Sequence, residues 1–296
     1  MKIVVADRLD EETIMDMKMR WNLAYQPEGL ANELAGADAL VVRSKTKVTA
    51  ELLAGAKNLR VVARAGVGLD NIDVKECEKK GIKVINTPGA PIQSVAELAI
   101  GLMLAVLRRI PRADSGMKAG KWGKESLLGN ELFGKSVGLV GFGRIGRAVA
   151  DRLLPFGVKL LVFDPHQKPC PECEFVTLEE LLRRSDIVTL HAALVEETRG
   201  IMSRERIGMM KKSAILINTA RGALVDEDAL YDALKSGNIA GAGIDVYPQE
   251  PYSGKLCELE NAVLLPHLGS STSECMSRVG KELVLGLEEF LGEQKR

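Results

Sequence analysis

The sequence predicts an α/β protein with two doubly wound parallel-sheet domains, and three observations lead to this prediction. Short apolar runs rich in Val, Ile and Leu alternate with amphipathic helical segments along almost the whole chain. Unbroken apolar runs are typical of strands covered on both faces, and strand–helix alternation gives right-handed βαβ units. The chain has 296 residues, a length that suits about two domains.

The expected strands are too numerous for one short sheet of this kind. In chain order they lie at residues 3–5, 39–42, 60–63, 83–85, 137–140, 160–163, 187–190, 214–217, 242–244 and 262–265. Helical patterns lie between them, at residues 50–56, 74–80, 178–184 and 227–236. We therefore expect two parallel sheets, each covered by helices.

Two turn-rich segments mark the expected domain boundaries. The first, residues 86–91, precedes a long apolar helical pattern over residues 94–117. Ser94 and Glu97 have the spacing of a capping box, so Ser94 is expected to be the N-cap of that helix. The second segment, residues 269–272, precedes the last helical pattern of the chain. The boundaries are therefore expected after residues 93 and 272.

The charge balance argues against several classes of partner. Lys plus Arg and Asp plus Glu each number 40, so the formal net charge is zero, and 46% of the residues are hydrophobic. This composition is that of a folded protein. Bulk binding of nucleic acid or of a membrane surface favours a basic excess, so we expect neither partner. A local basic pocket for a small anion remains compatible with this balance.

Cysteine usage and the N-terminus favour a cytoplasmic protein. The five cysteines are odd in number and scattered, which is not the pattern of a disulfide framework. Cys170 and Cys173 form one C-x-x-C motif without a second pair, and zinc needs four ligands, so we expect no metal site. Charged residues follow the first apolar run too early for a signal peptide. The longest apolar stretch, residues 98–107, is half as long as a membrane span.

Residues 137–150 have the pattern of a strand, a G-x-G-x-x-G turn and a helix. Gly141 would allow the tight turn, Gly143 would let the backbone approach a pyrophosphate, and Gly146 would let the helix pack on the strand. The N-terminus of the helix would offer unpaired N–H groups to the anion. A glycine-rich turn without a ligand is the alternative, and the strand–turn–helix context argues against it.

The next expected strand ends at Asp164, 23 residues after Gly141. An acidic residue at this position accepts hydrogen bonds from the adenosine ribose and repels a 2′-phosphate. The sequence therefore predicts NAD rather than NADP as the cofactor.

Three later strands end in segments with ionisable side chains. Arg221 follows the strand at 214–217, Glu250 lies in the segment after 242–244, and His267 follows 262–265. Ligands of open α/β sheets bind outside the carboxyl ends of the strands. We therefore expect these three side chains to form a reaction site.

These motifs, with several further segments, resemble the D-isomer-specific 2-hydroxyacid dehydrogenase family over nearly the whole chain. The matching segments are residues 42–49, 64–73, 86–89 and 117–122, the glycine-rich turn and the three strand ends. Within the family the resemblance is nearest to members that oxidise 3-phospho-D-glycerate, in a short form without their C-terminal regulatory domain. No serine feedback through such a domain is therefore expected.

The resemblance implies a fold and an activity. It implies a flavodoxin-like substrate domain in residues 1–93 with a returning helix in 273–296, and a Rossmann NAD-binding domain in residues 94–272. It implies oxidation of 3-phospho-D-glycerate to 3-phosphohydroxypyruvate by hydride transfer to NAD, the first step of serine biosynthesis. Two alternatives stay open: a glyoxylate or hydroxypyruvate reductase, and an NAD-sensing protein without catalytic activity.

The expected catalytic roles follow from the chemistry of the three side chains and match the family. His267 is the candidate base in oxidation and acid in reduction, because histidine has an unperturbed pKa of about 6.5. Glu250 would pair with the imidazole and set its tautomer. Arg221 offers a planar fork of donors to the substrate carboxylate and to the carbonyl oxygen.

The resemblance also implies the ligand-binding residues. The cofactor would contact Gly141, Gly143, Arg144, Ile145, Gly146, Asp164, His191, Ala192, Thr198, Thr219, Ala220, Asp245, His267 and Gly269. The small anionic 2-hydroxy acid would contact Arg43, Ser44, Arg64, Ala65, Gly66, Val67, Gly68, Lys124 and Arg221. Two positions depart from the family: Ala193 stands where proline is usual, and Lys124 stands where arginine is common.

The stretch around Trp122 belongs, in the family, to an arm that forms a dimer. A homodimer is therefore expected, and a higher homo-oligomer stays open.

Overall fold

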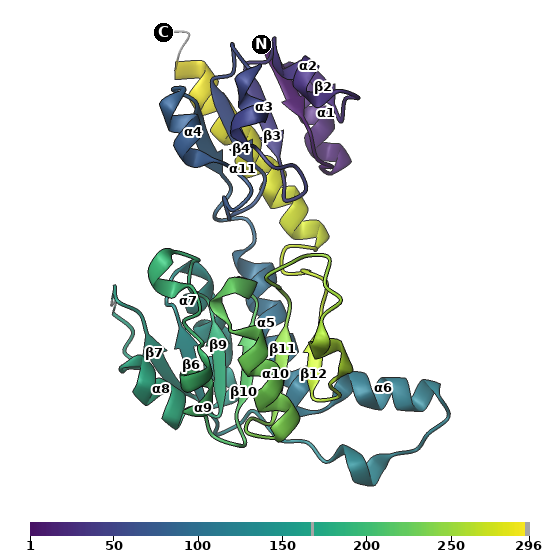
Figure 1. The fold of residues 1–296 in the computed structure, drawn as a ribbon, viewed down its shortest axis with the longest axis vertical. Helices are drawn as coiled ribbons and strands as arrows, with labels where there is room; N and C mark the ends of the chain where they lie inside the picture. Colours follow the sequence, from purple (N-terminus) through teal and green to yellow (C-terminus); the bar gives the residue numbers. More distant parts are fainter. Residues whose placement is uncertain (167–168, 294–296) are drawn as a thin grey trace. The chain divides into compact units, whose positions relative to one another are not determined.

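The computed structural model describes residues 1–166 and 169–293, and these form two compact units. One unit contains residues 1–92 and the segment from Ser270 onward, and the other contains residues 93–269. Both are α/β units with parallel sheets, as the sequence predicts (Figure 1).

The first unit has a five-stranded sheet in the flavodoxin-like order β2-β1-β3-β4-β5. Its strands are β1 (Lys2–Val5), β2 (Asn22–Tyr25), β3 (Ala39–Val42), β4 (Val61–Arg64) and β5 (Lys83–Asn86). Its helices are α1 (Glu11–Arg20), α2 (Leu30–Leu34), α3 (Ala50–Ala54), α4 (Val74–Lys79) and α11 (Ser273–Glu293).

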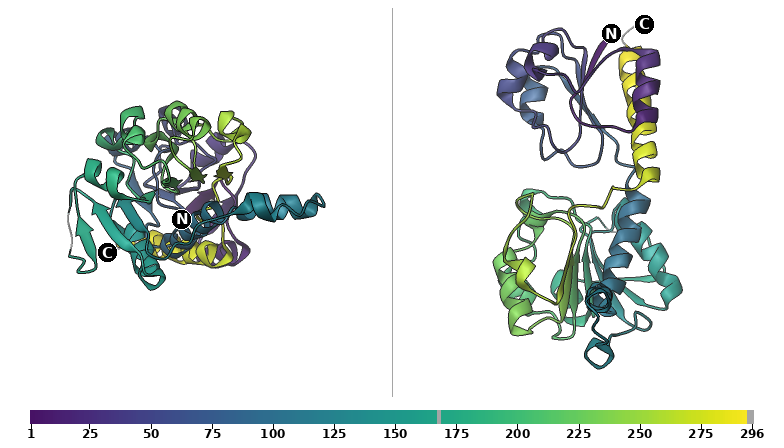
Figure 2. Two further views of the ribbon diagram at one scale, coloured as in Figure 1. Left: turned by 90° about the horizontal axis from the view of Figure 1, so that it is seen from below. Right: turned by 90° about the vertical axis from the view of Figure 1, so that its right-hand side faces the viewer.

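Alternate residues of these strands point into two cores. Ile3 and Val5 pack in a cluster with α1 and α11, whereas Val4 packs in a cluster with α2, α3 and α4. The side-by-side course of α1 and α11 is visible in the right-hand view of Figure 2. Burial on both faces explains why these strands are unbroken apolar runs.

The second unit has a seven-stranded parallel sheet in the order β12-β11-β10-β9-β6-β7-β8. Its strands are β6 (Ser136–Val140), β7 (Lys159–Phe163), β8 (Cys173–Phe175), β9 (Ile187–Leu190), β10 (Ile215–Asn218), β11 (Gly241–Ile244) and β12 (Ala262–Leu264). The order reverses at β6, so the carboxyl ends of β6 and β9 form the switch point where such sheets bind ligands.

Helices cover both faces of this sheet. They are α5 (Ile92–Leu107), α7 (Arg144–Leu153), α8 (Leu178–Arg184), α9 (Arg204–Gly208) and α10 (Glu227–Ser236). Helix α6 (Ile110–Lys118) also belongs to this unit but does not lie on the sheet (Figure 1). Leu181 of α8, Ile207 of α9 and Leu230 of α10 share one core with β9 and β10. On α5, Leu102 packs closely on β11, because a Cβ at Gly243 would lie only 3.1 Å from the Cβ of Leu102.

Two edge strands, β2 and β8, were not expected from the sequence. Both are only partly buried, so neither has the unbroken apolar run of the central strands. The other ten strands lie where the pattern predicts them, within one or two residues at their ends.

The expectation of one helix over residues 94–117, capped by Ser94, is wrong. Helix α5 begins at Ile92, and Ser94 is buried with its hydroxyl donating to the carbonyl oxygen of Gly269. The helix then ends at Leu107, Arg109 adopts the left-handed conformation, and Pro111 lies in the first turn of α6. A left-handed residue ends one helix, and a proline in the first turn favours the start of the next.

Helix α6 and the segment after it form an arm that extends away from the sheet of their unit (Figure 1). No residue of α6 is buried. Several large apolar side chains of the arm are exposed: Ile110, Met117, Trp122, Leu128 and Phe133.

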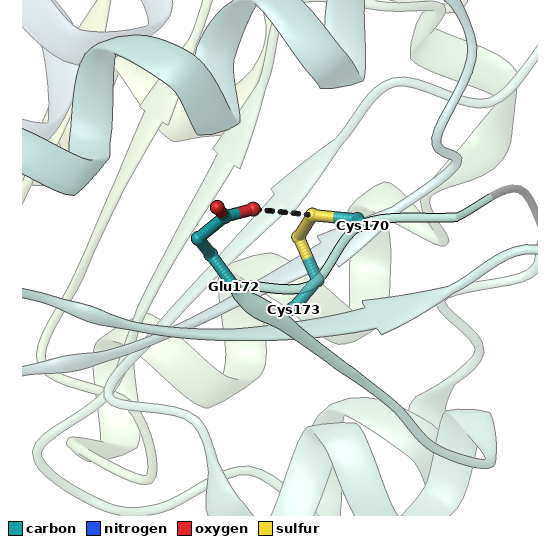
Figure 3. The surroundings of a disulfide bond; sticks show 3 residues. All are labelled: Cys170, Glu172 and Cys173. Carbon is teal, nitrogen blue, oxygen red and sulfur yellow. Dashed lines mark hydrogen bonds between the residues drawn. A yellow bond between two sulfur atoms is a disulfide. The ribbon is translucent and has the colours of Figure 1, made fainter.

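A disulfide joins Cys170, in the segment between β7 and β8, to Cys173, the first residue of β8 (Figure 3). The cysteines thus form one local cross-link, although they are no disulfide framework. Among the described residues, no helix has both the length and the apolar character that crossing a bilayer requires.

Candidate functional site

The glycine-rich turn connects β6 to α7 at the switch point of the seven-stranded sheet. Gly141 has a φ of 97°, which favours glycine, and a Cβ there would lie 2.6 Å from the amide nitrogen of Ala192. A Cβ on Gly146 would overlap the carbonyl oxygen of Gly141. A Cβ on Gly143 would meet only open space. Two glycines therefore serve the packing of the turn, and the third keeps its outer surface free for a ligand.

Helix α7 begins at Arg144, and the residue before it, Gly143, has no side chain to cap the helix. The N–H groups of the first turn, including those of Arg144 and Ile145, have no acceptor within the helix. Such a helix N-terminus favours an anion such as a pyrophosphate. The ring of Phe142 lies edge-on to Phe175 and under the guanidinium of Arg147, 4.6 Å away.

Asp164 follows β7, the neighbour of β6, and its carboxylate faces the glycine-rich turn. One oxygen accepts from the amide of Phe142 at 2.6 Å, and the other accepts from the amide of His166 at 2.7 Å. A carboxylate can accept about four hydrogen bonds, so both oxygens retain capacity for ribose hydroxyls. The two backbone amides thus hold the Asp164 carboxylate beside the anion-binding turn. There it suits an adenosine ribose with a free 2′-hydroxyl.

Two polar atoms at the neighbouring strand ends are buried without a hydrogen-bond partner among the described residues. They are Nδ1 of His191, after β9, and Oγ1 of Thr219, after β10. The other ring nitrogen of His191 lies 3.0 Å from the hydroxyl of Thr189. Burial lowers the pKa of His191 to about 4, so its imidazole is neutral at pH 7. Unsatisfied buried atoms are costly, so these two fit a polar ligand such as a dinucleotide.

The remaining expected cofactor residues have local partners. The hydroxyl of Thr198 accepts from the amide of Val195 and donates to the carbonyl oxygen of Ala193 at 2.7 Å, so it closes its own loop. The amide of Ala220 donates to the side chain of Asn218.

Arg221 lies in the turn after β10. Its Nη1 donates to the carbonyl oxygen of Ala220 at 2.6 Å, and its own carbonyl oxygen accepts from the side chain of Asn218 at 2.9 Å. The next residue, Gly222, lies so close to the backbone of Tyr247 and Pro248 that a Cβ would overlap it. The turn with Arg221 therefore rests directly on the segment that leads to Glu250.

Glu250 and His267 form a pair between the segments after β11 and β12. Oε2 of Glu250 lies 2.8 Å from Nδ1 of His267, and Oε1 accepts from the amide of Tyr247 at 3.2 Å. A carboxylate has no proton to donate, so Nδ1 carries the proton and Nε2 is the nitrogen left for a substrate. The imidazole is 44% exposed, so a substrate can reach it.

Asp245 anchors the turn that carries His267. Its fully buried carboxylate accepts from the amides of Leu268 at 2.6 Å and Gly269 at 2.9 Å. Burial raises the pKa of this carboxyl, and the two amide donors oppose the rise. Both oxygens are thus engaged by the protein itself, at a position where the sequence predicts a cofactor contact.

The expected substrate residues fall into two groups. Arg43 and Arg64 lie at the ends of the paired strands β3 and β4 in the first unit. The guanidinium of Arg64 bends back over the chain, donates to the carbonyl oxygen of Ala65 at 2.8 Å and lies against Gly66, whose φ is 146°. Ser44, Val67 and Gly68 belong to the same loops. Lys124 begins the short helix η1 (Lys124–Leu127) in the second unit and is exposed.

Arg43 is tied to its neighbours through its backbone. Its amide donates to Asp7 at 2.6 Å, and its carbonyl oxygen accepts from Asn71 at 2.7 Å. Among the described residues, the side chain of Arg43 makes one long hydrogen bond, of 3.4 Å, to the carbonyl oxygen of Arg8.

Two residues of the site carry no role in the sequence-based prediction, namely Asn218 and Tyr247. Asn218 braces the turn with Arg221, and Tyr247 holds Glu250. Asn218 is the last residue of the apolar strand β10, and Tyr247 follows the apolar strand β11 by three residues. In the sequence, this position at a strand end is the signal that marks them. No cluster of His, Cys, Asp and Glu suited to a metal ion occurs among the described residues.

Comparison with known proteins identifies similar chains. Residues 100–269 match the family model of the D-isomer specific 2-hydroxyacid dehydrogenase, NAD binding domain. A hydroxypyruvate reductase of Thermotoga maritima is 47% identical, and the match covers 98% of each chain. A D-3-phosphoglycerate dehydrogenase of Methanocaldococcus jannaschii is 44% identical over 94% of this chain and 55% of that protein. The chain thus spans about half the length of that relative.

Solved structures agree with these matches. A D-lactate dehydrogenase from Aquifex aeolicus, complexed with NAD and lactic acid, superposes with a TM-score of 0.88 at 30% identity, covering 99% and 96% of the two chains. A protein from Thermus thermophilus superposes with a TM-score of 0.90 at 37% identity, covering 98% and 97%.

Proposed function

The chain belongs to the D-isomer-specific 2-hydroxyacid dehydrogenase family, and from this premise we propose that it is a hydroxypyruvate reductase that forms D-glycerate with NADH. The observation that carries the chemistry is the Glu250–His267 pair, 2.8 Å apart, on the sheet edge that also holds the glycine-rich turn. The choice of hydroxypyruvate rests on the end-to-end match with the reductase of Thermotoga maritima.

The residues of the chain divide the work between binding and proton transfer. The glycine-rich turn and Asp164 would hold the cofactor NADH, which would supply the hydride. Arg221 binds the substrate carboxylate with its planar fork and polarises the keto oxygen. His267 donates a proton from Nε2 to that oxygen, while Glu250 holds Nδ1 and stabilises the charged ring. In the oxidation direction His267 takes the hydroxyl proton instead.

The first unit carries further groups suited to an anion. In the loop of residues 65–68 the amides of Ala65 and Gly66 already donate to the carbonyl oxygens of Val42 and Arg64, so the amides of Val67 and Gly68 are the donors left for a carboxylate. Arg43 and Arg64 lie at the ends of adjacent strands and favour a second candidate substrate, 3-phospho-D-glycerate, because two neighbouring cations suit a phosphate.

A substrate panel tests the proposal. Initial rates would be measured for hydroxypyruvate, glyoxylate, 3-phosphohydroxypyruvate and 3-phospho-D-glycerate, with NAD(H) and NADP(H). We expect the highest kcat/KM for hydroxypyruvate with NADH. A higher value for the phosphorylated pair would replace the proposal with phosphoglycerate oxidation and a role in serine biosynthesis. Tight NADH binding with no turnover of any 2-keto acid would indicate an NAD-sensing protein.

Arg43→Ala separates the two substrates. The variant keeps the backbone contacts of residue 43 and removes only its guanidinium. If the two arginines hold a phosphate, loss of a charged hydrogen bond should lower kcat/KM for the phosphorylated substrate roughly 10- to 100-fold. The value for hydroxypyruvate should change less than about twofold by the same reasoning. Lys57→Ala, at an exposed lysine of the same unit, is the control.

The exposed apolar side chains of the arm support a homodimer. Trp122 and Leu128 are 79% and 83% exposed, and such patches mark association surfaces. Sedimentation of Trp122→Ser and Leu128→Ser variants at micromolar concentration tests this point, with dissociation to monomers as the expected result.

A further inference from the structure

Tyr247 reaches each of the three segments that carry Arg221, Glu250 and His267. Its amide donates to Oε1 of Glu250 at 3.2 Å. Its backbone lies directly against Gly222, the residue after Arg221. Its hydroxyl lies 2.9 Å from the carbonyl oxygen of Leu265, two residues before His267. All these contacts lie within the second unit, and the side chain is buried.

The turn around His267 is held from two sides. After His267 in the chain, Asp245 accepts from the amides of Leu268 and Gly269. Before His267 in the chain, the amide of Leu265 donates to the carbonyl oxygen of Ile244 at 2.9 Å, and the carbonyl oxygen of Leu265 accepts from the Tyr247 hydroxyl. The Tyr247 hydroxyl is therefore the side-chain group that holds the segment before His267.

His267 itself has a φ of 55°, in the left-handed region that most residues avoid. Such a conformation is strained for a residue other than glycine and persists only where the surroundings impose it. Loss of the Leu265 contact would let this turn relax, and the imidazole would move relative to Glu250.

The ring of Tyr247 is itself fixed. It stacks on Tyr252 with centroids 4.1 Å apart and an interplanar angle of 14°. Burial raises the pKa of the Tyr247 hydroxyl far above its usual value, so the group stays protonated and can donate at any working pH. A phenol donates one hydrogen, and the shorter distance assigns it to Leu265 rather than to Ile244 at 3.2 Å.

We propose that Tyr247 is a positioning residue for the reaction: its hydroxyl holds the His267 turn while its backbone amide holds Glu250, so one residue fixes the geometry of the pair. The expected effect on kcat rests on the proposed function, whereas the expected effect on the geometry of the Glu250–His267 pair does not.

The kinetic test uses Tyr247→Phe, which removes the hydroxyl and keeps the stacked ring. Loss of one hydrogen bond should lower kcat roughly three- to tenfold, with KM for the keto acid and Kd for NADH within about twofold of wild type. Tyr252→Phe is the matched control. Its hydroxyl contacts Glu227 and the amide of Leu256, so kcat should stay within about twofold. Equal kcat for wild type and Tyr247→Phe would overturn the proposal.

A spectroscopic test needs no turnover. The chain has 3 histidines, so ¹⁵N imidazole spectra can be assigned with His267→Gln. At about pH 8.5, where ordinary imidazoles are neutral, wild type should show His267 protonated at Nδ1. Tyr247→Phe should give a mixture of tautomers, and Tyr252→Phe should not.

The two tests separate the two proposals. If wild type turns over no 2-keto acid but the spectrum of Tyr247→Phe changes, the proposed function fails and the positioning role stands. If wild type is active and Tyr247→Phe keeps the Nδ1 tautomer, the positioning role fails alone.

Discussion

Two regions at the carboxyl edge of the seven-stranded sheet are built on opposite principles. The glycine-rich turn is shaped by the backbone, because Gly141 and Gly146 are packed so closely that no Cβ fits. The reaction end is shaped by side chains, because Arg221, Glu250 and His267 come from three strand ends and are braced by hydrogen bonds. A substitution at Gly141 or Gly146 should therefore disturb fold and binding together, whereas one in the second region should remove chemistry and leave the fold intact.

His267→Gln should break the reaction end most completely. Glutamine cannot transfer a proton, and general acid–base catalysis contributes about 10²- to 10⁴-fold, so kcat should fall by that factor. The Kd for NADH and the thermal midpoint should stay near wild type, because the glycine-rich turn is untouched. Stopped-flow reduction of hydroxypyruvate and NADH fluorescence titration provide the measurements. Retention of wild-type kcat would show that His267 is not the acid.

Gly146→Ala and Gly143→Ala form a matched pair for the turn. In Gly146→Ala the new methyl group overlaps the carbonyl oxygen of Gly141, so overpacking should cost about 1–3 kcal/mol of unfolding free energy. In Gly143→Ala the methyl group meets only open space, so the stability should be unchanged while NADH binding weakens. Urea unfolding and NADH titration of both variants separate packing from binding. Unchanged NADH affinity in Gly143→Ala would contradict the proposal that the open surface at Gly143 binds the cofactor.

The same contrast explains what the sequence could predict. The glycine spacing and the apolar runs are local signals, so the turn, ten strands and the fold class can be read from residues close together in the chain. Ser94 shows where local signals fail: its spacing to Glu97 suggests a cap, but burial and the contact with Gly269, 175 residues away, decide its role.

The reaction end depends more strongly on contacts between distant segments. The position of Glu250 and His267 at strand ends predicts a shared site, but the bracing by Tyr247 and Asn218 exists only once β10, β11 and β12 are paired. The edge strand β8 was missed for a related reason, because half-buried edges lack the unbroken apolar run that marks a central strand.

His191 lies between the two regions and predicts a smaller, pH-dependent effect. Its pKa is lowered to about 4 by burial, whereas the unfolded chain has a pKa of about 6.5. Between these values the unfolded state binds more protons, so stability falls as the pH decreases from about 6.5 to 4 and is unaffected above that window. The loss at pH 5 should be about 2 kcal/mol.

Comparison with His191→Gln isolates this contribution from other titrating groups. Urea unfolding of both proteins at pH 7.5 and pH 5 should show a decrease for wild type that exceeds the decrease for the variant by about 2 kcal/mol. His166→Gln is the control, because His166 is exposed, and it should follow wild type. Equal decreases in wild type and His191→Gln would mean that the imidazole is protonated without cost. In that case its unpaired Nδ1 would not be the neutral, buried group that we assign to the dinucleotide site.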